Sequence, residues 1–141
     1  MTRTISIDDM NFHAPPALKL LGGKVQSFNQ DTGTIEMYFV ADESHCHSGD
    51  IVQGGFLAGM LDATMAHVVF CVLDAIVVVA TLEIKVSYLA IARPGKLVGR
   101  GWICRMGKTI SFLEAELLDE QGTVLARASS TARIIHRSPG A

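Results

Sequence analysis

The pattern of apolar and polar positions changes its period once along the chain. Small and apolar side chains run almost unbroken after Gly54 and Gly55, and they predict a long helix from Phe56 to about Phe70. In residues 80–91 the period becomes two, because apolar side chains alternate with Glu83, Lys85 and Ser87. The chain is therefore predicted to have a helical centre followed by an extended second half.

Turn residues delimit the other elements. Two prolines precede residues 17–21 and two glycines follow them, which predicts a short helix. Polar or glycine-containing turns at residues 30–33, 93–95, 106–108 and 119–122, and a polar loop at 42–52, separate the remaining strands. Besides 80–91, the predicted strands are residues 24–29, 34–40, 96–105, 109–118 and 124–136.

This order of elements predicts one α+β domain over residues 1–141, with residues 1–23 as a helical lead-in. An antiparallel sheet would wrap one apolar helix. Such a sheet exposes its edge strands, and the helix exposes an apolar side. Pairing with a second copy of the chain would cover both, so we expect a homodimer that can assemble further into a homotetramer.

Composition narrows the function classes. The net charge is -2 and no basic stripe is present, which argues against nucleic-acid binding. Three cysteines without a CxxC pattern, and no signal peptide, indicate reduced thiols and a cytoplasmic protein. We expect Cys71 and Cys104 in the core and Cys46 as a loop thiol.

The longest apolar stretch, residues 68–82, does not predict a membrane span. Asp74 interrupts it, and Glu83 and Lys85 follow before a bilayer could be crossed. A helix end and a strand start, joined by a turn at residues 73–74, explain this stretch.

One carboxylate stands out within the apolar helix. Asp62 shares a side of the helix with small residues, and burying an acid without a partner is costly. The free N–H groups at Gly54 and Gly55 can bind a carbonyl oxygen or an anion. Since Asp62 lies roughly 12 Å further along the axis, joint action on one carbonyl requires a second, antiparallel copy of the helix. Local hydrogen bonding of Asp62 to backbone is the structural alternative.

Three stretches carry a resemblance to a known family. Residues 47–55 together with Asp62, residues 81–89, and the Arg-Pro-Gly turn at 93–95 resemble the hotdog-fold acyl-CoA thioesterases of the phenylacetate-degradation type. The resemblance covers residues 24–135 and implies the hotdog fold, with hydrolysis of acyl-CoA to a carboxylic acid and CoA. It implies that backbone N–H of Gly54 or Gly55 holds the thioester carbonyl. Asp62 of the opposing subunit would be the general base or the nucleophile, and Thr81 would orient the water.

The chain departs from the family pattern before the two glycines. Many members have Asn, Gly and His where this chain has His47, Asp50 and Gln53. Backbone donors survive these changes, and the Gln53 amide can donate where His would, so we give it a supporting role. Asp50 adds a negative charge that this pattern does not explain.

Two other functions stay open from the sequence. Hydroxyacyl dehydratases of the same fold use a loop His and a helix carboxylate, which His47 and Asp62 could imitate, although the proline-rich motif between them is missing. The chain could also bind acyl-CoA without catalysis. We expect His47 and His45 to face solvent, and His67 to be a core residue with a satisfied ring nitrogen.

Two further sets of residues are candidates for contacts with the acyl group and with CoA. Met60, Leu61 and Met65 could line an acyl tunnel between subunits or simply pack in the core. Scattered surface cations, namely Arg93, Lys108 and Arg133, are candidates for the CoA phosphates. The predicted reaction needs no metal and no redox cofactor.

Overall fold

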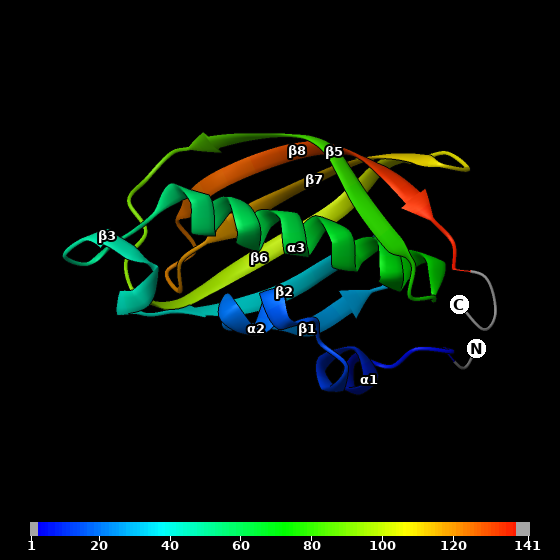
Figure 1. Ribbon diagram of the computed structural model, residues 1–141, viewed down its shortest axis with the longest axis horizontal. Coiled ribbons are helices and arrows are strands. Elements are labelled where there is room, and N and C mark those ends of the chain that lie inside the picture. Colours follow the sequence, from blue (N-terminus) through cyan, green and yellow to red (C-terminus); the bar gives the residue numbers. More distant parts are fainter. Residues whose placement is uncertain (1–2, 138–141) are drawn as a thin grey trace.

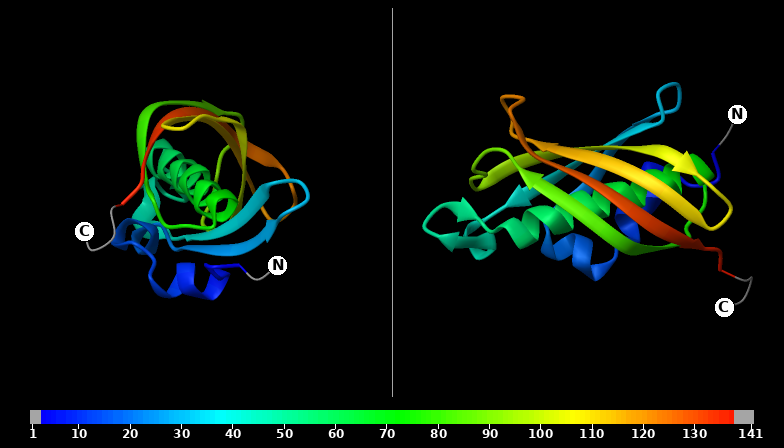
Figure 2. Two further views of the ribbon diagram at one scale, coloured as in Figure 1. Left: turned by 90° about the vertical axis from the view of Figure 1, so that its right-hand side faces the viewer. Right: turned by 90° about the horizontal axis from the view of Figure 1, so that it is seen from above.

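Six antiparallel strands form one sheet that curls around a single long helix (Figures 1 and 2). The computed structural model describes residues 3–137. The strand order is β1-β2-β6-β7-β8-β5, so β1 and β5 are the two edges. The elements are β1 (Gly23–Asn29), β2 (Thr34–Ala41), α3 (Gly54–Leu73), β5 (Val78–Tyr88), β6 (Gly95–Met106), β7 (Ile110–Leu118) and β8 (Val124–Ile135). The predicted α+β arrangement is confirmed.

The core lies between α3 and the concave face of the sheet. Seen along its axis in the left view of Figure 2, α3 runs inside the curl of the strands. Glycines on β6 allow this close packing, because a Cβ at Gly99 would collide with the hydroxyl of Thr64 on α3. The Thr64 hydroxyl donates to the Met60 carbonyl at 2.8 Å, so it is satisfied although fully buried. Apolar burial on this side of α3 is the main force that holds helix and sheet together.

The predicted strands are found with shifts of one to three residues at their ends, and the central helix is longer than predicted at both ends. The short helix expected at residues 17–21 is α2 (Pro16–Leu20). The pattern missed α1 (Ile7–Phe12), whose Ser6 and Asp9 form a capping box. It also missed a 3₁₀ turn, η1 (Glu43–His45), and the small hairpin of β3 (Cys46–Ser48) and β4 (Ile51–Val52) within the polar loop. These pieces are too short to show a period.

Asp74 ends α3 and ties the amino-terminal segment to it. This residue has a left-handed backbone, with φ of 51°, where Asp is one of the tolerated residue types. The N–H groups of Thr4 and Ile5 donate to its carboxylate at 2.7 and 2.9 Å, and Arg3 lies 3.6 Å away. The Thr4 and Ile5 hydrogen bonds lower the pKa of Asp74. The lead-in is therefore fastened to the carboxyl end of α3.

Two predictions about individual side chains are wrong. Cys104 is exposed because the alternation of β6 places it on the outer face with Arg100, opposite the buried Leu97, and its thiol donates to Glu114 at 2.8 Å. His45 is buried, at 4% exposure, because its ring contacts the Leu20 carbonyl and the Phe56 ring. Cys71 is buried and Cys46 is half-buried.

The apolar stretch at residues 68–82 divides as predicted. Helix α3 ends at Leu73 and β5 begins at Val78. By length and mean hydropathy (20 residues, 1.9) α3 would also qualify as a membrane span, and half of the window is buried inside the domain. Packing against the sheet accounts for the apolar side of α3 that is buried.

Candidate functional site

The amino end of α3 presents free backbone donors. Gln53 is the N-cap residue, and its own N–H donates to the His45 carbonyl at 2.8 Å. The N–H groups of Gly54 and Gly55 meet no acceptor within residues 3–137. The helix dipole adds partial positive charge at this point. The arrangement can bind a carbonyl oxygen or the oxyanion that forms from it.

Tyr88 explains why residue 54 is glycine. The Tyr88 hydroxyl donates to the Gly54 carbonyl at 2.7 Å, and a Cβ at Gly54 would lie 3.1 Å from the Tyr88 ring. At Gly55 a Cβ would meet only the Gln53 amide, at 3.9 Å. Sequence reasoning did not single out Tyr88, although it ends the apolar alternation of β5. Its ring fixes the position of the helix start.

Asp62 has a side-chain partner on β5. The Thr81 hydroxyl donates to the Asp62 carboxylate at 2.7 Å. Simple alternation would place Thr81 on the face opposite Ile84 and Val86, but the β5–β8 register shifts between Thr81 and Glu83. This β-bulge turns Thr81 toward α3. The structural alternative, a carboxylate hydrogen-bonded to local backbone, is therefore not what the structure shows.

The pair lies on the open side of α3. Asp62 is half-buried and Thr81 is exposed. Gly59, Ala63 and Ala66 occupy the same side and are also only half-buried. Because eight residues of continuous helix separate Gly54 from Asp62, roughly 12 Å lie between them along the axis. One chain cannot bring its own helix start and its own Asp62 to the same carbonyl.

His45 links the start of α3 to the elements that precede it. The Asp42 N–H donates to its Nδ1 at 3.0 Å, which leaves the proton on Nε2, and Nε2 lies 2.7 Å from the Leu20 carbonyl. The ring also packs edge-on against Phe56, with centroids 5.1 Å apart. The two ring nitrogens thus connect η1 to α2, and the ring packing connects both to α3. The signal that could have revealed this role is Asp42, a typical capping residue three positions earlier.

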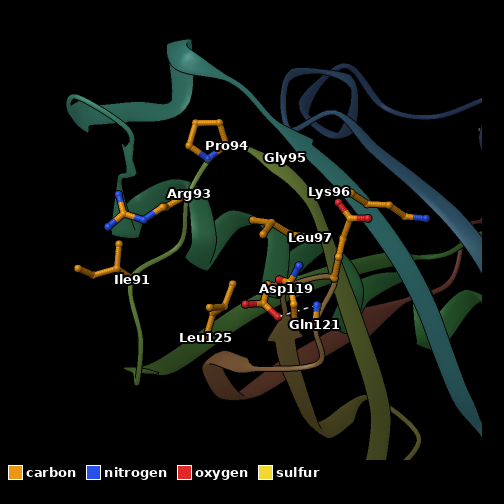
Figure 3. A pocket seen from close by; sticks show the side chains of 10 residues that line it. Ile91, Arg93, Pro94, Gly95, Lys96, Leu97, Asp119, Gln121 and Leu125 are labelled. Carbon is orange, nitrogen blue, oxygen red and sulfur yellow. Dashed lines mark hydrogen bonds between the residues drawn. The ribbon is translucent and has the colours of Figure 1, made fainter.

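The structure explains the negative charge of Asp50, because Asp50 forms an ion pair with Arg93. Its carboxylate lies 2.7 Å from the Arg93 guanidinium, and both side chains are more than half exposed. Arg93 also borders a hollow of about 320 Å³ between residues 91–97 and the turn at 119–121 (Figure 3). The negative charge of Asp50 is therefore offset locally.

His47 lies on the small hairpin and is exposed. Its Nδ1 lies 2.8 Å from the Ser48 hydroxyl, which is its hydrogen bond within the described residues. The expectation that His47 faces solvent is confirmed.

The three predicted cations are not brought together in one chain. Arg93 lies at the end of the domain where α3 begins, beside Asp50. Lys108 is in the β6–β7 turn, and Arg133 pairs with Ile110 on β7, at the opposite end of the sheet (Figure 1). One anion cannot contact all three within a subunit.

Met60, Leu61 and Met65 belong to the hydrophobic core. Their exposed fractions are 0%, 0% and 1%. Met65 also accepts a hydrogen bond from the Ser130 hydroxyl at 3.3 Å. All three are buried within the subunit, which agrees with the packing alternative.

A family model described as the thioesterase superfamily matches residues 49–126, which is more than half of the chain. The chain belongs to the thioesterase superfamily. The matched region begins before the helix start and contains Asp62, Thr81 and Tyr88. The hotdog fold and the predicted resemblance to thioesterases are confirmed.

Proteins that are similar to this chain in sequence or structure include the following three. The chain is 26% identical over 123 residues to a candidate esterase of Saccharolobus solfataricus, covering 87% of this chain and 86% of that protein. A candidate thioesterase of Ralstonia eutropha JMP134, related to phenylacetic acid degradation, superposes with a TM-score of 0.79 at 28% identity, over 90% of this chain and 98% of that one. A thioesterase-named protein of Streptococcus pneumoniae TIGR4, solved with coenzyme A, has a TM-score of 0.76 at 18% identity, over 94% and 100%.

Proposed function

We propose that this thioesterase-superfamily protein hydrolyses acyl-CoA thioesters in a site shared by two subunits. Asp62 of one subunit would face the partner subunit's Gly54 and Gly55. The observation that carries the proposal is the 2.7 Å hydrogen bond from Thr81 to Asp62, which holds a carboxylate on the open side of α3. The free N–H groups at the start of α3 in the partner subunit would supply the second half of the site.

The chemistry follows from these groups. Backbone N–H at the helix start polarises the thioester carbonyl and stabilises the oxyanion, with each donor contributing roughly 3–4 kcal/mol. One Asp62 oxygen accepts from Thr81, and the other removes a proton from water. The hydroxide adds to the carbonyl carbon, the C–S bond breaks, and CoA leaves as a thiolate that takes up a proton. Direct attack by Asp62 on the carbonyl is the second route to the same products.

Unpaired surfaces support the dimer. Strand β5 is an edge of the sheet, and Leu82 on it is 61% exposed. Leu89 and Ile91, just after β5, are 57% and 58% exposed. A second copy that pairs along this edge would cover these apolar side chains and the open side of α3. Association of two such dimers into a tetramer extends the same proposal.

CoA binding draws support from the fold, because a hotdog relative was solved with coenzyme A. Among the predicted cations, Arg93 lies at the helix-start end, and we assign it to the CoA phosphates. Binding there would compete with its ion pair to Asp50.

Subunit mixing tests the shared site. Asp62→Asn and Gly55→Val chains should each be inactive alone, measured as thiol release from aryl, short and long acyl-CoA esters. Random mixing after co-expression should recover about a quarter of the wild-type rate, because half of the dimers are mixed and each mixed dimer has one intact site. No recovery in proven mixed dimers would contradict the shared site. Wild-type protein that binds acyl-CoA without turnover would instead be a binding protein.

The dehydratase alternative gains nothing from the structure, since His47 is exposed and bonded to Ser48. We expect no hydration of an enoyl-CoA by the wild-type protein.

A further inference from the structure

The carboxyl half of α3 borders an apolar chamber that the thioester site does not use. Its volume is about 480 Å³, which lies in the range of small-molecule sites, about 300–1,000 Å³. The walls come from the lead-in, from α3 and from the turn that follows α3, and they are largely Ile5, Met10, Phe70, Ile76 and Val77. Phe70 lies eight residues beyond Asp62, roughly 12 Å along the helix.

One polar side chain of α3, His67, lines this chamber. The ring of His67 borders it, and the residue is only 5% exposed. Its Nδ1 lies 2.7 Å from the Ala63 carbonyl, so Nδ1 carries the proton. Nε2 is then a hydrogen-bond acceptor, and it has no partner within residues 3–137. Burial lowers the pKa of His67, which favours this neutral form.

The border of the chamber carries no excess of formal charge that would select an ion. Asp9 and Arg137 both border it and have opposite formal charges, and the other titratable side chains on it are His13 and His67. The Asp9 carboxylate is already engaged by the Ser6 N–H in the capping box. A carboxylate ligand would also meet the lone pair of His67 Nε2, which repels it. A neutral ligand with one hydrogen-bond donor fits these surroundings.

We propose that the chamber is a second binding site, for a small neutral apolar molecule with one hydroxyl group, which donates to His67 Nε2. An apolar body would fill the space between Met10, Phe70 and Val77. The hydroxyl would bond to an acceptor that no group of residues 3–137 engages, on a side chain that is only 5% exposed. Selectivity for a hydroxyl over an apolar group of the same shape follows.

Three probes that share a toluene body and differ in the para substituent test this selectivity on the intact protein. 4-Methylphenol can donate to Nε2, 4-methylanisole can only accept, and p-xylene can do neither. Binding is followed by NMR through the ring ¹⁵N resonances of His67 and the methyl groups of Ile76 and Val77. We expect 4-methylphenol to bind about tenfold more tightly than p-xylene, which is the value of about one net hydrogen bond. We expect 4-methylanisole to bind no better than p-xylene.

Variants separate the acceptor from the space. His67→Phe should abolish the preference for 4-methylphenol, while His67→Gln, which keeps an acceptor, should retain part of it. Ile76→Trp changes a residue that is 48% exposed, so the fold should tolerate it, and the larger side chain should reduce the binding of all three probes. His136→Gln replaces an exposed histidine that does not border the chamber and should change nothing.

Equal binding of 4-methylphenol and p-xylene, or binding of neither, would overturn the proposal. Shifts centred on Asp62 and Thr81 would also overturn it, because they would place the ligand at the thioester site. The readout is binding at His67, so a failure of thioester hydrolysis leaves this result unaffected, and the reverse also holds.

Discussion

Helix α3 carries one acid and one imidazole, five residues apart, in opposite surroundings. Asp62 is half-buried on the open side, and its partner is the Thr81 hydroxyl from another element, β5. His67 is 5% exposed, and its partner is the Ala63 carbonyl of its own helix. The first is held by tertiary structure and left reachable, whereas the second is enclosed.

The contrast shows how one apolar helix supports two kinds of site. A carboxylate that accepts from a hydroxyl keeps a second oxygen available for a reacting water. An imidazole whose Nδ1 donates to its own helix becomes a fixed neutral acceptor. The neighbouring elements, β5 for Asp62 and the lead-in for His67, decide which outcome occurs.

The largest expected effect is on kcat, and it should separate Asp62 from His67. Asp62→Asn should lower kcat for acyl-CoA hydrolysis by about 10³-fold, because general base or nucleophilic catalysis is lost. His67→Gln should change kcat by less than about threefold, since His67 lies outside the proposed reaction. Thiol release at saturating substrate measures both. Glu83→Gln, an exposed acid on β5, is the matched control. Comparable losses in the Asp62 and His67 variants would remove the distinction.

The next effect is on stability, where a change at His67 should cost more than a change at Asp62. His67→Ala should lower the free energy of unfolding by about 2–3 kcal/mol, because it leaves a cavity beside Phe70 and removes a partly buried hydrogen bond. Asp62→Ala should cost less than about 1 kcal/mol, because its surroundings are open. Urea unfolding must be compared at one protein concentration, since subunit association changes apparent stability. A larger loss for Asp62→Ala would show that the carboxylate is structural.

A smaller effect on kcat tests whether the Thr81 hydroxyl orients Asp62. Thr81→Val should reduce kcat about tenfold, because Asp62 loses the hydrogen bond that orients it. Thr81→Ser keeps the hydroxyl and should restore most of the rate. If Val and Ser variants are equally active, the hydroxyl has no part in catalysis.

The smallest effect concerns pH. Burial lowers the pKa of His67 below 6.5, so the unfolded chain binds more protons there than the folded chain does. Stability is therefore complete above the unfolded pKa and is lost as pH falls through the folded pKa. Melting temperatures from about pH 7.5 to about pH 5 should fall less in His67→Gln than in the wild type. His136→Gln should keep the wild-type slope. The lowered pKa of Asp74 acts below 3.8, outside this window.

Part of the site was predictable because it depends on local pattern. Two glycines before an apolar run give a helix start with free donors, and an acid within that run is an exception that needs a partner. The turns at residues 30–33 and 119–122 also have local signatures, and the hairpins they join are found. The family match extends from residue 49 to 126, so the motifs that carried the resemblance lie largely within it.

Other features could not be predicted from pattern alone. A β-bulge in β5 overturns simple alternation, since it turns Thr81 toward Asp62. His45 is buried by contacts with Leu20 and Phe56, which lie far apart in sequence. Tyr88 reaches Gly54 only because β5 runs back along α3.

The sequence by itself determined the elements, their order, and the acid and helix start that make chemistry possible, because period, turn residues and backbone donors act over a few neighbours. Tertiary structure decided which side chains meet. Strand register placed Thr81 against Asp62, loop packing enclosed His45, and the lead-in closed a chamber over His67. These outcomes depend on contacts between distant segments, for which no local pattern of residues carries the information.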